Sequence, residues 1–553
     1  MLNTFYVIAL KSVNIQKRCL GSGFLLHIIY FLGLLFSCQS TAQSSQAFSA
    51  TGASPSVNAI NMVSFGADPT GVKDSAAAVR GVVASVGPVA ATLYFPKGTY
   101  RFASHGATAE ECVRLASISL LGDGPGQTIF TDDATPACKS QFGFFWSMGT
   151  DSRSDYSFES DPGYPVDAST AGLGSITIQL IGASDASKYA AGQYVFLRGT
   201  ALPQPGEYHG ELNLVTAVNS STGVITLGWP LSSSFIQDTG LQLNLVATTE
   251  VLSNIQISGI TFNFHNNSFL AAQIRGLKIF NNEFTYLGSS AGWEVSQLNQ
   301  LQNVEFNNNI VNNPQGAALD VERTSNSWDI HDNVLYGWFD AGEGGSNIHF
   351  HNNTITCVGT QICVRVATAG NMIDHNQIYS SCPTDSCHAV TDVTPPFVSV
   401  NTVITYNYVS ADGPRAISVE SPGTVVSENI ISTLYTGNDI DSANISAINN
   451  TVTLTGSGPY GCVLVEGLSH ASVIQGLTCN GNSTSYDRAI WIADNGPQLA
   501  TPLVIDGIVG NNLLMGIYVV NGSNDSPVIG TASFTNTITP FVGMPTWTFF
   551  GSH

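Results

Sequence analysis

Charged side chains are scarce in this chain, and basic ones are the scarcest. Of 553 residues only 10% are charged, with 18 Lys and Arg against 39 Asp and Glu and a formal net charge of −21. This balance argues against nucleic-acid binding, which requires Lys and Arg to displace counterions from phosphates. Amphipathic helices need many charged residues on their wet faces, so the scarcity, together with 54 Gly, indicates a β-rich chain.

The only cysteine spacings present are unlike those of zinc sites, because the chain has no CxxC motif with a nearby pair of histidines. Eight cysteines follow residue 38, and they fall in sequence-local couples. An even number of cysteines in such couples favours a disulfide framework and an oxidising compartment. The predicted bridges are Cys112–Cys138, Cys357–Cys363, Cys382–Cys387 and Cys462–Cys479.

The first 42 residues have the pattern of a targeting segment. Residues 11–18 hold three basic side chains, an apolar run covers 24–36, and small residues follow. The segment ending at Cys38 resembles a lipoprotein signal with an outer-membrane lipid anchor, although Phe36 departs from that pattern. Cleavage after residues 40–42 and an uncleaved anchor are the alternatives. In each case the chain is expected outside the cytoplasm, secreted, periplasmic or lipid-anchored at the cell surface.

An asparagine recurs along the chain at intervals in the low twenties, with a large apolar residue two positions after each one. The repeat is Asn282, Asn308, Asn333, Asn353, Asn376, Asn407, Asn429 and Asn450. This period is too short for two helices and a turn, and it predicts a solenoid of stacked strands that share one core. Asparagine tolerates left-handed backbone, and its amide can bond to the amides above and below in a ladder.

The N-terminal region carries three features in a fixed order. They are the segment Val63–Asp74 with a helix expected over Ser75–Val86, the strand and turn Leu93–Tyr100, and the segment Ile118–Ile129 with its Gly-Asp-Gly turn. Residues 60–130 resemble the opening of the pectate-lyase-like, right-handed parallel β-helix superfamily, which includes rhamnogalacturonases, polysaccharide lyases, uronan epimerases and phage tailspikes. The resemblance implies an all-β, right-handed parallel β-helix solenoid with an N-terminal capping helix. It does not imply one chemistry, because the superfamily hosts many reactions.

Residues 171–248 interrupt the repeat and read as a small inserted β subdomain, with strands expected at 176–180, 194–197, 212–215 and 223–227. The predicted organisation is a leader over 1–42, a linker over 43–57, the cap and first coils over 58–170, the insertion over 171–248 and the main β-helix over 249–545.

Alternate side chains of a strand point outward, so the polar residues between apolar ones mark the outer face. On this rule Asp320, Glu322, Asp340 and Glu343 come from adjacent rungs about 4.8 Å apart. Their carboxyl groups are then expected roughly 5–9 Å apart, a range that spans both glycosidase geometries. These four are the candidate catalytic residues.

The candidate substrate-binding residues are Trp338, Arg365, Trp491 and Tyr518, because aromatic rings cover sugar faces and an arginine holds hydroxyls or acids. Ser418 is expected on the same face. Glu420 and Glu466 are interpreted as solvated surface acids.

These residues favour a glycan-active protein, with a glycoside hydrolase that needs no cofactor as the first hypothesis. A polysaccharide lyase assisted by Ca²⁺ at the Asp320–Asp340 cluster is the second, and a non-catalytic glycan-binding surface protein is the third. The chain lacks a clear Gly-His-Gly, Arg-x-Lys or Asp-Pro-His-acid motif. No catalytic residue is therefore transferred from the enzymes of the superfamily. A polysaccharide is the expected partner, and the oligomeric state stays open.

Overall fold

The structure is a computed structural model in which parts of the chain are described. These are residues 59–103, 113–133, 142–146, 163–201, 208–246, 251–265, 267–288, 296–299, 301–322, 325–343, 345–359, 362–366, 370–382, 387–392, 401–456, 461–466, 471–482, 487–493, 502–520 and 527–543. The expected leader with Cys38 and the linker lie outside them. No helix within the described ranges is long and apolar enough to span a membrane.

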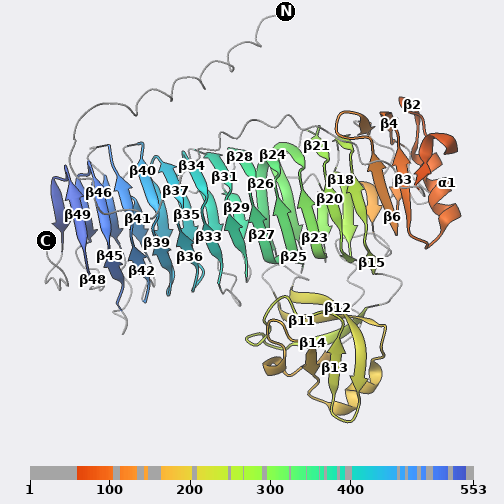
Figure 1. The fold of residues 1–553 in the computed structure, drawn as a ribbon, viewed down its shortest axis with the longest axis horizontal. Coiled ribbons are helices and arrows are strands. Elements are labelled where there is room, and N and C mark those ends of the chain that lie inside the picture. Colours follow the sequence, from red (N-terminus) through yellow and green to blue (C-terminus); the bar gives the residue numbers. More distant parts are fainter. Residues whose placement is uncertain are drawn as a thin grey trace, which may run out of the picture. The chain divides into compact units, whose positions relative to one another are not determined.

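Parallel strands stack rung upon rung into a solenoid, which confirms the predicted all-β parallel fold (Figure 1). Each regular rung contributes one strand to each of three series. The first series is a sheet of its own and consists of β1 (Ile60–Asn61), β3 (Ala91–Phe95), β6 (Ile118–Gly122), β15 (Leu252–Ser253), β16 (Gln256–Ser258), β19 (Ile274–Arg275), β20 (Lys278–Phe280), β23 (Gln302–Asn307), β25 (Asn326–His331), β27 (Ser346–His351), β30 (Met372–Asp374), β33 (Val403–Thr405), β36 (Val425–Ser427), β39 (Ser446–Ile448), β42 (Val473–Gln475), β45 (Val504–Asp506) and β48 (Val528–Ile529).

The second and third series are joined in one larger sheet, because the long strands β24 (Ile310–Glu322) and β26 (Val334–Glu343) run through both. The second series also holds β2 (Thr70–Asp74), β4 (Gly98–Arg101), β7 (Thr128–Thr131), β17 (Thr261–Phe264), β21 (Glu283–Tyr286), β28 (Thr354–Val358), β31 (Gln377–Ser381), β34 (Tyr408–Ala411), β37 (Ile430–Thr433), β40 (Thr451–Leu454), β43 (Thr478–Asn480), β46 (Ile508–Asn511) and β49 (Ala532–Thr535). The third holds β5 (Val113–Arg114), β8 (Phe142–Trp146), β18 (Asn267–Ala272), β22 (Ser296–Asn299), β29 (Ile362–Val366), β32 (His388–Asp392), β35 (Arg415–Val419), β38 (Thr436–Ile440), β41 (Val463–Val465), β44 (Arg488–Ile492), β47 (Met515–Val519) and β50 (Thr539–Val542).

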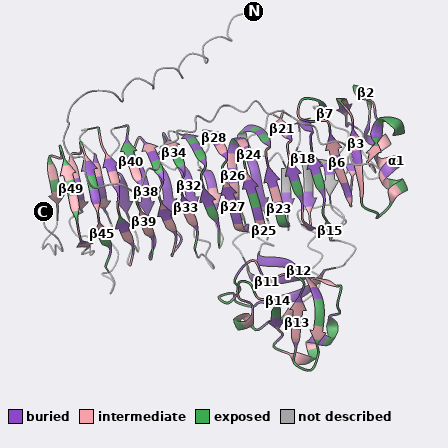
Figure 2. Ribbon diagram, in the orientation of Figure 1, coloured by how far each residue is buried: buried purple, intermediate pink, exposed green. Residues whose placement is uncertain are grey.

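The core runs inside the rungs, where apolar side chains of all three series pack together (Figure 2). In the first series Ile330 and Phe350 are fully buried, while the residues on either side of them alternate toward solvent. The period of two along each strand therefore places every second side chain in a dry interior and leaves the others outside.

The helix α1 (Ala76–Val86) covers the first coil, at the place predicted for it. It begins after Ser75 with the Asp74 carboxylate accepting a hydrogen bond from the Ala76 amide at 3.0 Å. Its apolar face, including Val79 and Val82, is buried in the core. The helix thus closes an end of the core that a further rung would otherwise have to cover.

The asparagine ladder exists, but its second member is Asn309 and the prediction of Asn308 is wrong. The ladder amides donate from Nδ2 to the next Oδ1 at 2.9–3.2 Å, in the order Asn282, Asn309, Asn333, Asn353, Asn376, Asn407, Asn429 and Asn450. The left-handed residue is the one before the ladder asparagine, as at Asn308 with φ 52° and His375 with φ 55°. The amide ladder, and not a left-handed backbone, therefore explains the ladder residue itself.

Three of the predicted disulfides are confirmed: Cys357–Cys363, Cys382–Cys387 and Cys462–Cys479. The fourth, Cys112–Cys138, lies outside the described residues.

The insertion expected over 171–248 is present as a separate antiparallel sheet with its own apolar core, but this sheet already begins before residue 171, at Tyr164. Its strands are β9 (Tyr164–Pro165), β10 (Thr177–Gln179), β11 (Tyr194–Ala201), β12 (Tyr208–Asn219), β13 (Val224–Leu227) and β14 (Gln242–Val246). The Arg275 guanidinium of the first series stacks 3.6 Å from the centre of the Trp229 ring. Hydrogen bonds from Gln302 Nε2 to Ser232 Oγ and from Asn326 Nδ2 to Ser233 Oγ, of 3.2 and 3.3 Å, add polar contacts between the insertion and the first series.

Candidate functional site

The third series carries one recurring five-residue pattern. In β29, β35 and β44 the second, third and fifth residues are buried and small or apolar, and the first residue is half-exposed. Two consecutive buried residues break the simple alternation, so the first and fourth residues are those left for the outer side. In these three strands the side chains on the outer side are therefore those of the first and fourth positions.

The fourth positions stand in register and form one continuous row across the rungs. From the N-terminal side the site row consists of Asp320, Asp340, Arg365, Thr391, Ser418, Asp439, Leu464, Trp491 and Tyr518. Neighbours in such a row are about 4.8 Å apart along the stack. Outward positions read from the sequence gave six of these nine residues, and the structure brings them into one line.

Asp340 and Arg365 form a two-pronged ion pair within this row. The Arg365 Nε lies 2.7 Å from Asp340 Oδ1, and its Nη2 binds the other carboxylate oxygen. Asp320 pairs with Asp340 in the register and is only 7% exposed. The two acids are neighbours on adjacent rungs, as the sequence predicts. The Arg365 guanidinium engages both carboxylate oxygens of Asp340, however, so Asp340 is poorly placed to exchange protons with a ligand.

Three other residues of the predicted site are Trp338, Glu322 and Glu343. Trp338 packs half-buried against the core, where the alternation predicted an outward ring. The register between β24 and β26 shifts twice in this region, and such a bulge changes which side chains face out. Glu322 and Glu343 end β24 and β26, and their side chains lie outside the described part of the structure.

A second group of charged residues surrounds Asp439, which the sequence analysis did not single out. The Arg415 guanidinium, from the first position of β35, reaches across to the next rung and lies 2.5 Å from Asp439 Oδ2. Its Nη2 is also 3.4 Å from Glu466 Oε2, one rung further on. Glu420 and Asp441, each directly after a strand, add two more carboxylates. These five residues are called the Asp439 cluster below.

Burial raises the pKa of the Asp439 carboxyl to about 7. The nearby acids Glu466, Asp441 and Glu420 act in the same direction, while Arg415 opposes them. Burial also raises the pKa of Glu420, to which Asp441 contributes. A carboxyl group that keeps its proton near neutral pH is the form that general-acid catalysis requires.

His388 occupies the first position of β32, the rung before Arg415. Burial, with a smaller contribution from Arg415, lowers its pKa to about 4, so the imidazole is neutral at physiological pH. Its Nε2 lies 3.5 Å from Arg415 Nη1, which only donates, so the proton belongs on Nδ1. The histidine therefore offers a neutral N–H donor beside the cluster.

Six buried side-chain polar atoms on β32 and β38 have no hydrogen-bond partner among the described residues. They are His388 Nδ1, Thr391 Oγ1, Thr436 Oγ1, Asn438 Nδ2, Asn438 Oδ1 and Asp439 Oδ1. Buried polar atoms in native proteins are nearly always satisfied by protein, water or a ligand. Their concentration on β32 and β38 indicates a place where a polar ligand or ordered water makes the missing bonds.

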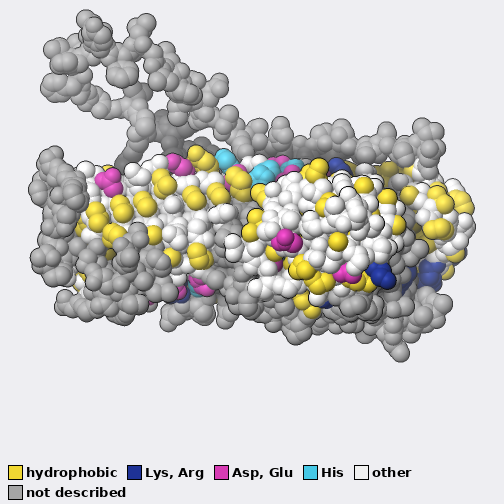
Figure 3. Space-filling view, turned by 90° about the horizontal axis from the view of Figure 1, so that it is seen from below, with side chains coloured by type: hydrophobic (Ala, Val, Ile, Leu, Met, Phe, Trp, Pro, Cys, Tyr) yellow, Lys and Arg dark blue, Asp and Glu magenta, His cyan; other side chains and the backbone are white. Residues whose placement is uncertain are grey.

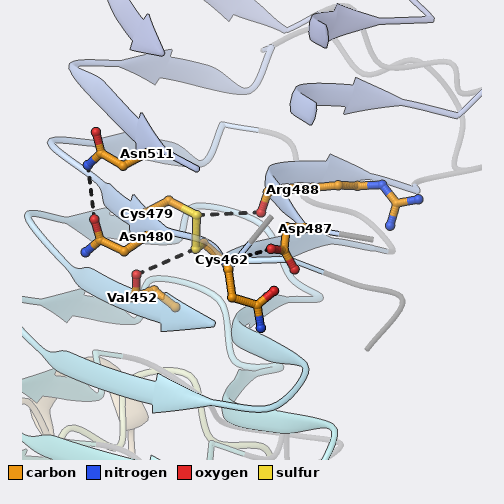
Figure 4. Close-up of a disulfide and its surroundings, with 8 residues drawn as sticks. Val452, Cys462, Cys479, Asn480, Asp487, Arg488 and Asn511 are labelled. Atoms are coloured by element: carbon orange, nitrogen blue, oxygen red, sulfur yellow. Dashed lines mark hydrogen bonds between the residues drawn. A yellow bond between two sulfur atoms is a disulfide. The ribbon is translucent and has the colours of Figure 1, made fainter. Parts of the chain in front are cut away.

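The row ends in two aromatic rings. Trp491 and Tyr518 lie 6.3 Å apart between ring centres, and the Arg488 guanidinium sits 4.8 and 4.9 Å from them. Figure 4 shows the Arg488 side chain directed away from the Cys462–Cys479 disulfide, while its carbonyl oxygen faces Cys479. The disulfide thus lies beside the backbone of β44, which carries Arg488 and Trp491.

Asp439 could not be recognised from alternation, because apolar and polar residues do not alternate along its strand. The sequence Thr436-Gly437-Asn438-Asp439-Ile440 places a polar Asn438 at a position that is apolar in the neighbouring rungs. The signal that could have found it is spacing, since Asp439 follows Ser418 by 21 residues. Glu420 and Glu466, interpreted as solvated acids, belong to this cluster as well.

Comparison with known proteins supports the resemblance at the N-terminal end. A family model described as "Rhamnogalacturonase A/epimerase, pectate lyase-like" matches residues 59–144. The chain therefore opens with a pectate-lyase-like segment. This segment contains α1 and the first coils, and the Asp439 cluster lies outside it.

Several solved structures are similar to this chain at low sequence identity. A tailspike of Pseudomonas phage phi297 is 15% identical, with 82% of this chain and 80% of that chain covered and a TM-score of 0.45. The A-module of the Azotobacter vinelandii mannuronan C-5 epimerase AlgE6 is 12% identical, covering 87% and 99% with a TM-score of 0.37. The catalytic unit of a Streptomyces thermodiastaticus α-1,3-glucanase is 11% identical, covering 91% and 71% with a TM-score of 0.38. No curated protein sequence matches the chain.

Proposed function

We propose that the chain is an extracytoplasmic glycoside hydrolase that acts on a polysaccharide, with Asp439 as its general acid. The observation that carries the proposal is the burial of the Asp439 carboxyl among three further carboxylates and one arginine, and this environment raises its pKa to about 7. Glycosidases need one carboxyl group that keeps its proton and a second that acts as base or nucleophile. The match of residues 59–144 to a family described by carbohydrate activities is consistent with such a substrate.

Glu466 is the proposed second carboxylate. It contacts the same guanidinium as Asp439, and its side chain is 38% exposed, against 3% for Asp439. Asp439 is buried and Glu466 is open to solvent. Such a difference in environment sets the pKa values of two carboxyl groups apart, so that one can act as the acid and the other as the base. Arg415 contacts both carboxylates, Asp439 at 2.5 Å and Glu466 at 3.4 Å, and so links the two acids through one guanidinium.

Sugar binding is assigned to the rest of the site row. Trp491 and Tyr518 supply two apolar faces of the kind that stack on pyranose rings, at the end of the row beyond Leu464. On the other side, Asp340 and Arg365 offer paired polar groups for hydroxyls. A chain of sugars lying along the stack would contact both ends of the row.

The elimination alternative requires cations that neutralise a uronate carboxylate, or a bound Ca²⁺. Arg365 and Arg415 are each engaged by carboxylates of the protein. The positive charge of Arg365 beside Asp340 also opposes a divalent cation at that point. Hydrolysis is therefore preferred over a Ca²⁺-assisted lyase reaction.

The disulfides support the proposed location of the chain outside the cytoplasm. Three bridges occur among the described residues, and disulfides persist in oxidising environments. With the expected leader over residues 1–42, this supports export from the cytoplasm. A lipid anchor at Cys38 remains part of the proposal and is tested by metabolic labelling with a fatty acid, which a Cys38→Ala variant should lose.

The test is digestion of a panel of neutral and acidic polysaccharides by the full chain, with product analysis. Asp439→Asn and Glu466→Gln should each lower activity by about 10²- to 10⁴-fold, the usual contribution of a positioned acid or base. The matched control is Glu428→Gln, which changes a carboxylate that bonds to Asn449 in a turn after the first series. This variant should keep full activity.

Other outcomes would point elsewhere. Loss of activity in Asp320→Asn or Asp340→Asn, with Asp439→Asn unaffected, would move the catalytic pair to the residues expected from sequence. Unsaturated products that absorb in the ultraviolet would establish elimination. Binding without cleavage by any polysaccharide, lost when Trp491 is replaced by Ala, would identify a non-catalytic glycan-binding protein.

A further inference from the structure

The outer side of the first series carries a group of histidine and aspartate residues that the proposed function does not use. Asp329 in β25 pairs in register with His349 in β27, and His351 follows two residues later on the same face. The intervening residues Ile330 and Phe350 are buried, so the polar ones point outward. Figure 3 shows histidine side chains gathered in one group on the face seen there.

Three ligand atoms converge at this point. Asp329 Oδ1 lies 2.8 Å from His351 Nε2 and 3.9 Å from His349 Nδ1, and all three atoms are within 4.8 Å of one another. The two imidazole rings stack with their centres 3.9 Å apart. Two nitrogens and one carboxylate oxygen thus surround a common point. Asn352 Nδ2 donates to His351 Nδ1 at 3.0 Å, so His351 Nε2 carries a proton that it donates to Asp329, and a bound metal ion would replace that proton.

The hydrogen bond made by one ring nitrogen of His349 determines whether the other ring nitrogen has a lone pair for a metal ion. Its Nε2 lies 2.6 Å from Asp374 Oδ1, so this nitrogen carries the proton and donates it to the carboxylate. The other nitrogen, Nδ1, then holds a lone pair that faces the Asp329 carboxylate 3.9 Å away. Two electron-pair donors that face each other across this gap leave room for a cation between them. A carboxylate behind a histidine is also the arrangement that orients histidine ligands of metals.

We propose that Asp329, His349 and His351 bind a divalent transition-metal ion, with Asp374 as the positioning residue. Imidazole nitrogens select Zn²⁺, Cu²⁺ or Ni²⁺, whereas Ca²⁺ and Mg²⁺ prefer oxygen ligands alone. Three protein ligands leave at least one coordination position open. The metal ties β25 to β27 and stabilises the folded chain by the free energy of its binding.

A groove lies next to the coordination position that the three protein ligands would leave open. This groove of about 580 Å³ is lined by Asp329, by Lys278 and Glu305 of the preceding rungs, and by Ser232 of the insertion. The ion would lie at one edge of this groove, since Asp329 belongs to both. A small ligand held there can reach the metal with an oxygen or nitrogen atom.

The test is equilibrium dialysis of the full, chelator-treated chain against Zn²⁺, with the bound metal measured by atomic absorption. The wild type should take up one Zn²⁺ per chain at this site. His349→Gln and His351→Gln should each lose it. Asp374→Asn should keep the stoichiometry but bind about 10- to 100-fold more weakly, as when an outer-shell partner is removed.

A matched control separates this site from general histidine binding. His265→Gln removes another histidine that pairs with an aspartate, Asp132, at 2.8 Å, and it should bind Zn²⁺ like the wild type. Thermal unfolding provides a second readout, because Zn²⁺ should raise the melting temperature of the wild type and of His265→Gln but not of His351→Gln. A wild type that binds no Zn²⁺, or ligand variants that bind it as the wild type does, would overturn the proposal.

Discussion

Asp439 combines burial with four charged neighbours. Its side chain is 3% exposed. One carboxylate oxygen, Oδ2, lies 2.5 Å from Arg415 Nε, and the other, Oδ1, has no hydrogen-bond partner among the described residues. Such a group is expensive to ionise, and this is the property that makes it useful as an acid. Function and stability are therefore linked at this residue.

The first prediction concerns stability against pH. The pKa of Asp439 in the folded chain, about 7, lies above its ordinary 3.8, so the folded chain binds this proton more tightly than the unfolded chain. The stabilisation is complete below about pH 4 and is lost as the pH rises through about 7. Asp439→Asn has no such proton. The melting temperature of the wild type, relative to this variant, should therefore fall between these pH values.

The size of this effect is on the order of a few kcal/mol, since each pKa unit corresponds to about 1.4 kcal/mol. Glu428→Gln serves as control and should follow the wild type at every pH. A constant difference in melting temperature between wild type and Asp439→Asn from pH 4 to 8 would show that the carboxyl titrates normally.

The asparagine ladder shows how one residue type organises a whole element. Each ladder amide accepts from the backbone N–H of the preceding ladder residue and donates to a backbone carbonyl, as Asn309 does toward Asn282 and Ile279. Its neighbour Asn308 has a different role, because its left-handed backbone turns the chain. Adjacent asparagines thus satisfy two separate requirements of the same turn.

This division gives a matched pair of substitutions. Asn309→Gly leaves buried donors and acceptors without partners, each worth about 1–3 kcal/mol, and should lower the free energy of unfolding clearly. Asn308→Gly should be nearly neutral, because glycine adopts a positive φ without strain. Chemical denaturation of both variants measures the difference. Equal destabilisation by the two would contradict the assigned roles.

The Cys462–Cys479 disulfide closes a stretch with a sequence separation of 17. Replacing both cysteines by Ala should lower the free energy of unfolding by about 3 kcal/mol, from the entropy that the crosslink removes from the unfolded chain. The same double replacement at Cys357 and Cys363, with a separation of 6, should have a smaller effect. Denaturation under non-reducing conditions measures both, and the reverse order would be inconsistent with the entropic explanation.

At the scale of the whole molecule, the period of the chain is what sequence predicts best. One asparagine per rung is enough to predict the solenoid, even with Asn308 chosen in place of Asn309, because a shift of one residue does not change the period. The row from Asp340 to Tyr518 follows from alternation wherever β-strands are regular. The alternation rule misses Asp439, because Asn438 places a polar residue at a position that is apolar in the neighbouring rungs.

The Asp439 cluster could not be predicted because it depends on long side chains that cross rungs. Arg415 reaches Asp439 on the next rung and Glu466 on the one after, 51 residues away in sequence. The alternation of apolar and polar residues predicts which side chains face outward, but it does not predict which of these side chains contact one another. The same limit applies to His349 and Asp374, whose contact depends on the stacking of β27 on β30.

The role of Asp439 as a general acid is best tested by the pH dependence of kcat/KM on whichever polysaccharide the full chain cleaves. If Asp439 donates its proton to the leaving group, activity should be retained below neutral pH and fall as the pH rises through about 7, the pKa of that carboxyl. Asp439→Asn should lose both the activity and this descending limb. Activity that stays level from pH 6 to 9, or an Asp439→Asn variant as active as the wild type, would contradict the account.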